Sequence, residues 1–369
     1  MSVLLAIAVL GILIVVHELG HFMAARLQNI HVNRFSIGFG PIIWKYQGPE
    51  TEYALRGFPL GGFVGFPDDD PDSFIPKNDP DLLRNRPILD RAIVLSAGVI
   101  ANLIFAYFLL AVQVGVFGVA DFNYAPGVKV SDVAVDVSSA AAQGGIKAND
   151  IILSVDNQQL GANQEAISTL VETIQNTANK TLEMEIQRDG EKLFLEITPE
   201  LGGDGKGRIG VQLISNGEIV RNTINNISEA CTLGAEEFQR IVVLTLQGFW
   251  QLISNFGQTA AKLAGPVAII DMGAKIAENN IGELLRFAAL ISVNLAVINI
   301  LPLPALDGGQ LAFLVIEGVR GKPLPLRIQE NVMQTGLVLL LGLGVFLIIR
   351  DTVNLDGVRS IFQRLSSTL

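Results

Sequence analysis

Long uncharged apolar runs alternate with polar segments along this chain and predict four membrane-spanning helices. Each run reaches the roughly 20 residues that a helix needs to cross the hydrocarbon core of a bilayer. Charged residues bound these runs, as Arg91 and Asp121 do for the second one. The expected spans are Ser2 to about Leu27, Ala92 to Ala120, Phe287 to Leu306 and Asn331 to Ile349.

A fifth uncharged stretch, Ile241 to Ala261, has a different pattern. Glutamines and asparagines recur every three or four residues along it, and aromatic and aliphatic residues occupy the other faces. This spacing predicts an amphipathic helix that lies on the membrane surface rather than crossing it.

The segment from Tyr124 to Gln212 changes to short runs of alternating apolar and polar residues, which are typical of strands. Ile151–Val155 and Leu182–Ile186 are examples, with a helical stretch at Asn163–Asn176 between them. Turn signals follow these runs at Asp156-Asn157 and at Asp189-Gly190. We therefore expect a small inserted α+β domain.

The loop after the first span is rich in glycine, proline and aromatic residues, notably in Phe35–Pro41 and Phe58–Phe66. Such runs predict tight β-hairpins. Two interpretations remain open from the residues alone: hairpins that dip into an apolar environment, or ordinary surface hairpins.

Composition agrees with a membrane protein that carries a soluble portion. The chain has 369 residues, of which 50% are hydrophobic and 17% are charged, and its net charge of −10 argues against nucleic acid as a partner. Its single cysteine excludes an intramolecular disulfide. The predicted organisation is a first membrane half (residues 1–123), the inserted domain (124–212), a linker with the interfacial helix (213–285) and a second membrane half (286–369).

Basic residues predict the orientation, because cytoplasmic loops carry an excess of lysine and arginine. No basic residue precedes the first span, whereas the loop after it holds eight: Arg26, Arg34, Lys45, Arg56, Lys77, Arg84, Arg86 and Arg91. We expect this loop in the cytoplasm and the inserted domain on the other side.

The first span contains a motif with catalytic spacing. His17-Glu18-Leu19-Gly20-His21 is an HExxH sequence, in which two histidines one helical turn apart share a Zn²⁺ and the glutamate acts on water. Ionisable residues inside an apolar span are costly, and they mark a functional site.

A catalytic zinc takes a third protein ligand, and Asp307 is the expected one. It ends the third apolar run beside two glycines, after Pro302 and Pro304, which break the helix and leave backbone groups free. His21 and Asp307 fall on the same side of the membrane only if Ile241–Ala261 does not cross. The metal site and the interfacial helix therefore support each other.

Together these motifs resemble the site-2 protease family of intramembrane zinc metalloproteases. HELGH occurs in the first span and Asn299 to Gly309 matches NxxPxPxLDGG, while Ala97-Gly98 and Asn102 are similar to the family's second-span AGPxxN motif. Val137 to Asn157 resembles a PDZ sequence, with Asn149 in place of the usual glycine. This single PDZ-like domain makes the chain most similar to the bacterial RseP type.

The resemblance implies a zinc metalloendopeptidase that cleaves membrane proteins within or near their transmembrane segments. His17, His21 and Asp307 would hold Zn²⁺ and Glu18 would be the catalytic base. The residues implied to bind unwound substrate are Asn299, Gly38, Phe39, Gly40, Pro302 and Pro304.

The implied substrates are single-span regulators or signal-peptide remnants in the lipid bilayer. The protein would be integral to the inner (plasma) membrane or to an organellar one, with the PDZ-like domain on the non-cytoplasmic side. Two alternative classes are a metal transporter with a midplane site and a non-catalytic PDZ scaffold.

Overall fold

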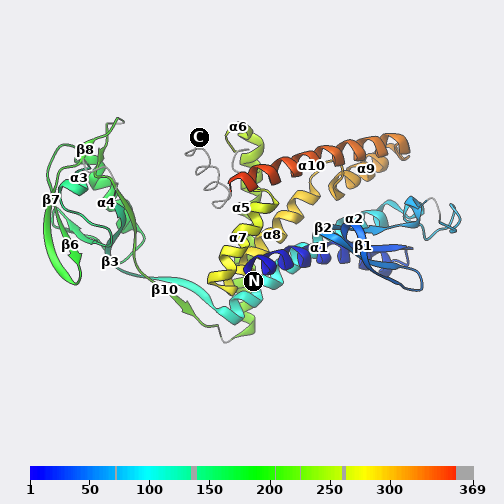
Figure 1. Ribbon diagram of the computed structural model, residues 1–369, viewed down its shortest axis with the longest axis horizontal. Coiled ribbons are helices and arrows are strands. Elements are labelled where there is room, and N and C mark those ends of the chain that lie inside the picture. The colour runs from blue at the N-terminus through cyan, green and yellow to red at the C-terminus, as the bar shows by residue number, and fades with distance from the viewer. Residues whose placement is uncertain (71–72, 134–138, 204, 225, 260–262, 355–369) are drawn as a thin grey trace, which may run out of the picture. The chain divides into compact units, whose positions relative to one another are not determined.

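The computed structural model describes residues 1–70, 73–133, 139–203, 205–224, 226–259 and 263–354, in two compact units (Figure 1). One unit combines Met1–Phe117 with the chain from Ile224 onward, and the other is Gly118–Thr223. The first unit is mainly helical and holds all the long apolar helices, so we call it the membrane unit. The second is the inserted domain.

The membrane unit contains eight helices and a pair of long strands within the described residues. The helices are α1 (Ser2–Leu27), α2 (Ile88–Phe117), α5 (Ile227–Ser254), α6 (Phe256–Thr259), α7 (Pro266–Asn279), α8 (Ile281–Ile300), α9 (Asp307–Arg320) and α10 (Leu326–Asn354). The strands are β1 (Arg34–Gln47) and β2 (Glu52–Gly65), and two short 3-10 turns follow them at Pro67–Asp69 and Leu83–Asn85.

Four of these helices are long and apolar enough to cross a membrane: α1, α2, α8 and α10. Their number agrees with the sequence, but their bounds correct it. The second expected span was placed too late, since α2 ends at Phe117, and the third runs from Ile281 to Ile300 rather than from Phe287 to Leu306. Charged first turns were left out of the expected spans, and Pro302 stops α8 before the predicted end.

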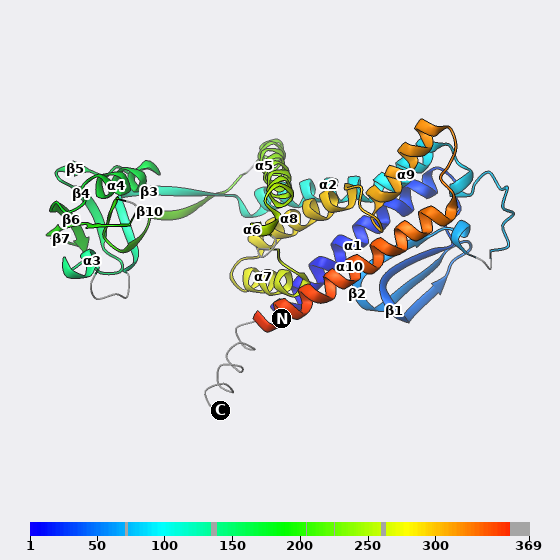
Figure 2. The same ribbon diagram turned by 90° about the horizontal axis from the view of Figure 1, so that it is seen from above.

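The stretch expected to lie on the membrane surface is divided between α5, which begins at Ile227, well before the predicted start, and the short helix α6. Residues 260–261 of that stretch lie outside the described chain. In the two ribbon views α5 runs at a steep angle to α2 and α8 (Figures 1 and 2). It packs on α2 and α8 and is not among the helices long and apolar enough to span.

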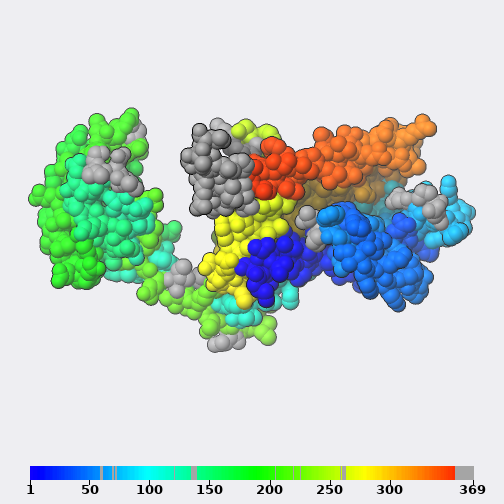
Figure 3. Space-filling view, viewed as in Figure 1, coloured from blue at the N-terminus to red at the C-terminus, as the bar shows by residue number. Residues whose placement is uncertain are grey.

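Small residues bring α1 and α2 into close contact. A Cβ added at Gly20 of α1 would lie 2.5 Å from the carbonyl oxygen of Ala97 and 2.7 Å from the Cβ of Ala101. Only glycine permits this approach, which is the device expected where helices pack without a hydrophobic driving force. The N-terminal end of α1 (dark blue) lies against α7 (yellow) in the space-filling view (Figure 3).

The strands β1 and β2 are each bent and pair with each other several times. Arg34–Ile37 pairs in parallel with Glu52–Leu55 and also antiparallel with Gly62–Gly65, and β1 beyond its bend pairs antiparallel with β2 before its bend. Positive φ angles of 88° at Gly38 and 85° at Gly40 allow the bend in β1. The loop after the first span therefore forms a small sheet, as its turn-rich sequence predicted.

The inserted domain is a twisted sheet with two helices around a conventional apolar core. The sheet order is β10-β3-β4-β6-β7, with β5 beside β4 and a separate pair β8-β9. The fully buried residues of the core include Val128, Ile152, Leu170 and Met184. Its elements are β3 (Val119–Val133), α3 (Ala140–Gln143), β4 (Ile151–Val155), β5 (Gln158–Gln159), α4 (Glu165–Asn176), β6 (Leu182–Arg188), β7 (Glu191–Ile197), β8 (Glu200–Leu201), β9 (Gly207–Arg208) and β10 (Val211–Asn222).

Local chemistry in this domain follows the sequence closely. The predicted strand Ile151–Val155 is β4, and the predicted turns at Asp156-Asn157 and Asp189-Gly190 have positive φ angles at all four residues. Asn149 has φ 73°, the conformation expected where it replaces glycine. The compact unit extends beyond the predicted 124–212, because β3 and β10 stay paired as far as Val119 and Asn222.

An ion pair between the buried Asp150 and the partly exposed Arg188 stabilises this domain. Arg188 at the end of β6 donates to both carboxylate oxygens of Asp150, at 2.8 and 2.7 Å, and Asp150 also accepts from the backbone N–H of Lys147. Burial by itself raises the pKa of Asp150, but these donors outweigh it and hold the pKa below the usual value. The pair therefore stabilises the domain as long as the carboxylate is charged.

Candidate metal centre

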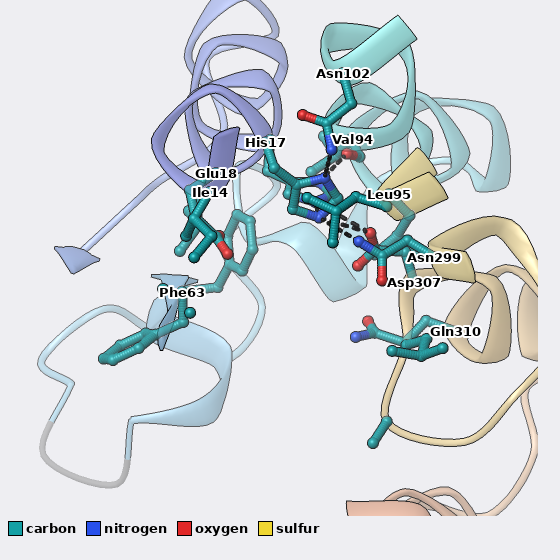
Figure 4. Close-up of a pocket in the computed structure, with 18 of the residues that line it drawn as sticks. Ile14, His17, Glu18, Phe63, Val94, Leu95, Asn102, Asn299, Asp307 and Gln310 are labelled. Atoms are coloured by element: carbon teal, nitrogen blue, oxygen red, sulfur yellow. Dashed lines mark hydrogen bonds and ion pairs between the residues drawn. The ribbon is translucent and has the colours of Figure 1, made fainter. Parts of the chain in front are cut away.

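One helix and the start of another converge on one point in the membrane unit (Figure 4). His17 and His21 come from adjacent turns of α1, and Asp307 is the first residue of α9. Their ligand atoms all lie within 4.8 Å of one another. The three residues that the sequence proposed as ligands, which lie far apart along the chain, are thus brought together.

The distances between these atoms have the size that a metal requires. The Nε2 atoms of His17 and His21 lie 3.2 and 3.3 Å from Oδ2 of Asp307, and 3.3 Å from each other. A tetrahedral zinc with bonds of about 2.0 Å to nitrogen and oxygen needs ligand atoms about 3.3 Å apart. The triangle therefore fits a zinc ion bound on one side of it.

The electrostatics also call for a cation. Nδ1 of His21 donates to the carbonyl oxygen of Val94 at 2.8 Å, so its Nε2 presents a lone pair. Oδ2 of Asp307 is buried and has no hydrogen-bond partner within the described chain. A neutral histidine lone pair and a carboxylate oxygen facing each other at this depth repel unless a positive charge lies between them.

Glycines make this convergence possible. A Cβ at Gly98 of α2 would lie 2.3 Å from Nε2 of His21 and 2.7 Å from Cε1 of His17. At the start of α9, a Cβ on Gly308 would lie 2.1 Å from the carbonyl oxygen of Leu301, and one on Gly309 would lie 2.4 Å from that of Leu303. From the sequence these glycines were known only as parts of motifs. The structure shows why glycine is needed at each of them, because a Cβ would clash with a neighbouring atom.

Asp307 is positioned by the turn before it as well as by its helix. Ala305 takes φ 69°, an unusual angle for a residue with a Cβ, and its N–H points at the sulfur of Met333 in α10 at 3.3 Å. On the far side of α9, Arg91 of α2 donates to both oxygens of Glu317 at 2.9 and 3.0 Å. The turn before Asp307 and the later part of α9 are thus both held in place by contacts with other helices.

A cavity of about 580 Å³ opens beside the three ligand residues. Its wall includes Glu18 from α1, Asn299 from the last turn of α8 and Gly61–Val64 from β2. Gly62 lies directly against Glu18, since a Cβ there would be 2.8 Å from Cγ of that side chain. The amide nitrogen of Asn299 is 3.2 Å from Nε2 of His17. The space adjoins both the ligand residues and the glutamate.

Other residues that the sequence proposed lie elsewhere. The lining of this cavity, within the described residues, does not include Gly38, Phe39 or Gly40; the ring of Phe39 packs over Gly61 instead. Pro302 is exposed, and Pro304 packs against Gly336 of α10. The segment of the small sheet that reaches the cavity is therefore Gly61–Val64 of β2, which the sequence analysis did not single out for substrate.

Comparison with known proteins gives one family over most of the chain. The model described as "Peptidase family M50" matches residues 5–343. A predicted zinc metalloprotease of Nostoc sp. is 60% identical over 367 residues, which cover 98% of this chain and 100% of the relative. The chloroplastic membrane metalloprotease ARASP of Arabidopsis thaliana is 49% identical over 360 residues, which cover 97% of this chain and 80% of the relative.

A more distant relative and one solved structure complete the comparison. The regulator of sigma-E protease RseP of Escherichia coli is 30% identical over an alignment of 442 residues, which covers 92% of this chain and 96% of the relative. The PDZ domain of an SdrC-like protein from Listeria monocytogenes matches 24% of this chain and 87% of its own, with 19% identity and a TM-score of 0.21.

Proposed function

The chain belongs to peptidase family M50, and we propose that its zinc is held by His17, His21 and Asp307 while Glu18 acts as the catalytic base. The protein is an intramembrane zinc metalloprotease of the site-2 type, which hydrolyses peptide bonds within or near transmembrane segments of membrane proteins. The observation that carries the residue assignment is the triangle of 3.2–3.3 Å between the three ligand atoms.

Bound zinc would supply a Lewis acid for the scissile carbonyl and an activated water at neutral pH. Glu18 follows His17 on α1 and lines the same cavity, so its carboxylate takes a proton from the attacking water. The same carboxyl group then gives that proton to the leaving nitrogen as the C–N bond breaks. Gly62, which lies against Glu18, keeps this side chain at the cavity.

A transmembrane helix must unwind before its backbone can be attacked, because its own hydrogen bonds cover the peptide groups. We propose that the amide of Asn299 binds the unwound strand. Gly61–Val64 of β2 borders the cavity, so this segment is better placed than Gly38–Gly40 to pair with substrate by β-addition. The role of Gly38 and Gly40 is then to bend β1, and that of Pro302 and Pro304 is to end α8 ahead of Asp307.

The inserted domain is proposed to control access. It is PDZ-like in sequence, and β10 forms the edge of its sheet with α4 packed nearby. An edge strand beside a helix suits capture of an extended peptide. The basic residues of the first loop favour a non-cytoplasmic location for this domain, on the opposite side from Asp307. The proposed substrates are single-span regulators or signal-peptide remnants in an inner (plasma) or organellar membrane.

The test uses the full chain purified in detergent micelles with a fluorogenic peptide that contains one transmembrane segment. Cleavage should stop when a chelator removes zinc and return when zinc is added back. Asp307→Ala should lose zinc and activity together, whereas Asp271→Ala, which removes a partly exposed carboxylate on α7 that pairs with Lys275, should lose neither. Normal cleavage by the Asp307→Ala variant would show that the third ligand is a different residue.

A further inference from the structure

Asn102 is a fully buried polar side chain near the metal centre, and the mechanism above gives it no role. It lies in the middle of α2 with no exposed surface, and its Oδ1 has no hydrogen-bond partner within the described chain. Its amide nitrogen is 3.3 Å from Nδ1 of His17 (Figure 4). A buried amide with one unsatisfied atom beside a ligand residue requires an explanation.

The position of the proton on His17 explains why a buried amide lies beside this residue. A neutral histidine that offers Nε2 to a metal must carry its hydrogen on Nδ1, and that N–H needs an acceptor. His21 has such an acceptor in the carbonyl oxygen of Val94, at 2.8 Å. For Nδ1 of His17, the hydrogen-bonding group within reach in the described structure is the Asn102 amide. The two ligands are therefore supported by different kinds of acceptor.

The orientation of the amide decides which form of His17 is stable. If the nitrogen of Asn102 donates to Nδ1, the hydrogen of His17 sits on Nε2, where it excludes a metal. A 180° rotation of the amide changes its shape very little and exchanges its oxygen and nitrogen. After that rotation Oδ1 accepts from Nδ1–H, and Nε2 is free to bind.

We propose that Asn102 is a positioning residue for zinc: its side-chain oxygen accepts from Nδ1 of His17 and fixes the tautomer and ring orientation in which Nε2 is a ligand. This inference rests on the proposed ligand set. The backbone at this position is itself held, because Ser292 of α8 donates from Oγ to the carbonyl oxygen of Asn102 at 2.8 Å. The amide therefore has a rigid base from which to orient the ring.

The test compares zinc affinity across substitutions in the full chain, by competition with a chromophoric chelator. Asn102→Leu removes the acceptor and should weaken zinc binding about 10–100-fold, the usual effect of losing such a partner. Asn102→Asp keeps an acceptor and should stay within a few-fold of the original chain. Gln113→Leu removes another buried amide from α2 and should leave affinity unchanged.

A direct measurement makes the proposal falsifiable even where Asn102→Leu does not fold. The chain has only three histidines, so ¹⁵N-labelled histidine gives a simple spectrum of the zinc-loaded protein. Nδ1 of His17 should be protonated, and its resonance should move in Asn102→Asp while that of His21 stays.

Two results would overturn the proposal: an unprotonated Nδ1 on His17, or an Asn102→Asp variant that binds zinc as weakly as Asn102→Leu. Failure of the ligand set itself would look different, because Asp307→Ala would then bind zinc as the original chain does.

Discussion

The membrane unit and the inserted domain use buried polar groups in opposite ways. In the inserted domain, the ion pair between the buried Asp150 and the partly exposed Arg188 is complete, with donors matched to the acceptor, and the domain has an ordinary apolar core. In the membrane unit, two histidines and Asp307 turn acceptor atoms toward one another, an arrangement that needs a positive charge between them. The ion pair of the inserted domain needs no further partner, whereas the triangle of His17, His21 and Asp307 needs a bound cation to balance its acceptor atoms.

Close approaches at glycine occur in both units, but only some of them adjoin the metal centre. In the inserted domain, a Cβ on Gly207 would lie 2.2 Å from the carbonyl oxygen of Ile174, where a strand packs on a helix. Gly98, Gly308 and Gly309 of the membrane unit have neighbouring atoms where a Cβ would stand. Close packing around an electrostatically unbalanced group indicates a site built for binding. We therefore assign the chemistry to the membrane unit and access to the inserted domain.

The largest effect should come from Glu18→Gln. The amide cannot take the proton of water, so cleavage should fall by about 10²–10⁴-fold while zinc content stays unchanged. Single-turnover cleavage and metal analysis on the same sample measure both. A Glu18→Gln variant that has lost its zinc would instead make Glu18 part of the metal site and would change its assigned role.

Gly98→Ala should remove zinc without adding any polar group. The new methyl would lie 2.3 Å from Nε2 of His21, so α1 and α2 must separate and the ligand triangle must open. Gly115→Ala is the matched control on the same helix, because its methyl would meet only Cβ of Ala230 at 3.5 Å. Zinc content near that of the original chain in Gly98→Ala would contradict the packing described for the site.

The ion pair between Arg91 and Glu317 should affect the metal through the orientation of α9. Arg91→Gln leaves Glu317 half-buried without its partner, and we expect a loss of zinc affinity of about tenfold, close to 1.4 kcal/mol. Restoring an opposite pair by Arg91→Glu with Glu317→Arg should recover part of this loss. Equal affinities in all three proteins would show that α9 holds Asp307 without this pair.

The smallest effect on activity is expected in the inserted domain. Asp150→Asn should destabilise that domain by about 1.5–3 kcal/mol, the usual contribution of a hydrogen bond to a charged group.

The stabilisation by Asp150 should also depend on pH. The pKa of Asp150 is lowered in the folded state, so the carboxylate stabilises the domain above the unfolded-state pKa of about 3.9, and this stabilisation disappears as pH falls through the lower folded value. Hydrogen exchange of amides in Gly118–Thr223 should accelerate in the variant while cleavage of a short peptide stays the same. A large loss of that cleavage would contradict the division of roles.

Local signals in the sequence predicted most of the fold and the three proposed ligand residues that the fold brings together. The apolar runs gave the number of long helices, and the turn residues at Asp156-Asn157 and Asp189-Gly190 fixed the hairpins. HExxH and the aspartate after two prolines gave candidate ligands because metal chemistry restricts both residue type and spacing.

Features that depend on tertiary contact could not be predicted in this way. The helix from Asp307 to Arg320 was missed because the sequence analysis treated its start as the end of a span. The approach of Gly61–Val64 to the cavity depends on how two bent strands pair, which no local pattern encodes. The contact between Asn102 and His17 joins helices 85 residues apart in sequence.

Replacing Tyr124–Gly217 by a two-residue Asn-Gly turn tests the division of roles most directly. Asn123 and Glu218 pair directly across the ribbon formed by β3 and β10, so such a turn can close it without disturbing Val119 or Asn222. Cleavage of a transmembrane peptide that has no outer domain is then measured in the zinc-loaded variant and in the full chain. We expect both proteins to cut the short peptide at a similar rate, and only the variant to cut substrates with bulky outer domains as well. A folded, zinc-loaded variant that no longer cuts the short peptide would contradict it, because the inserted domain would then be needed for the chemistry itself.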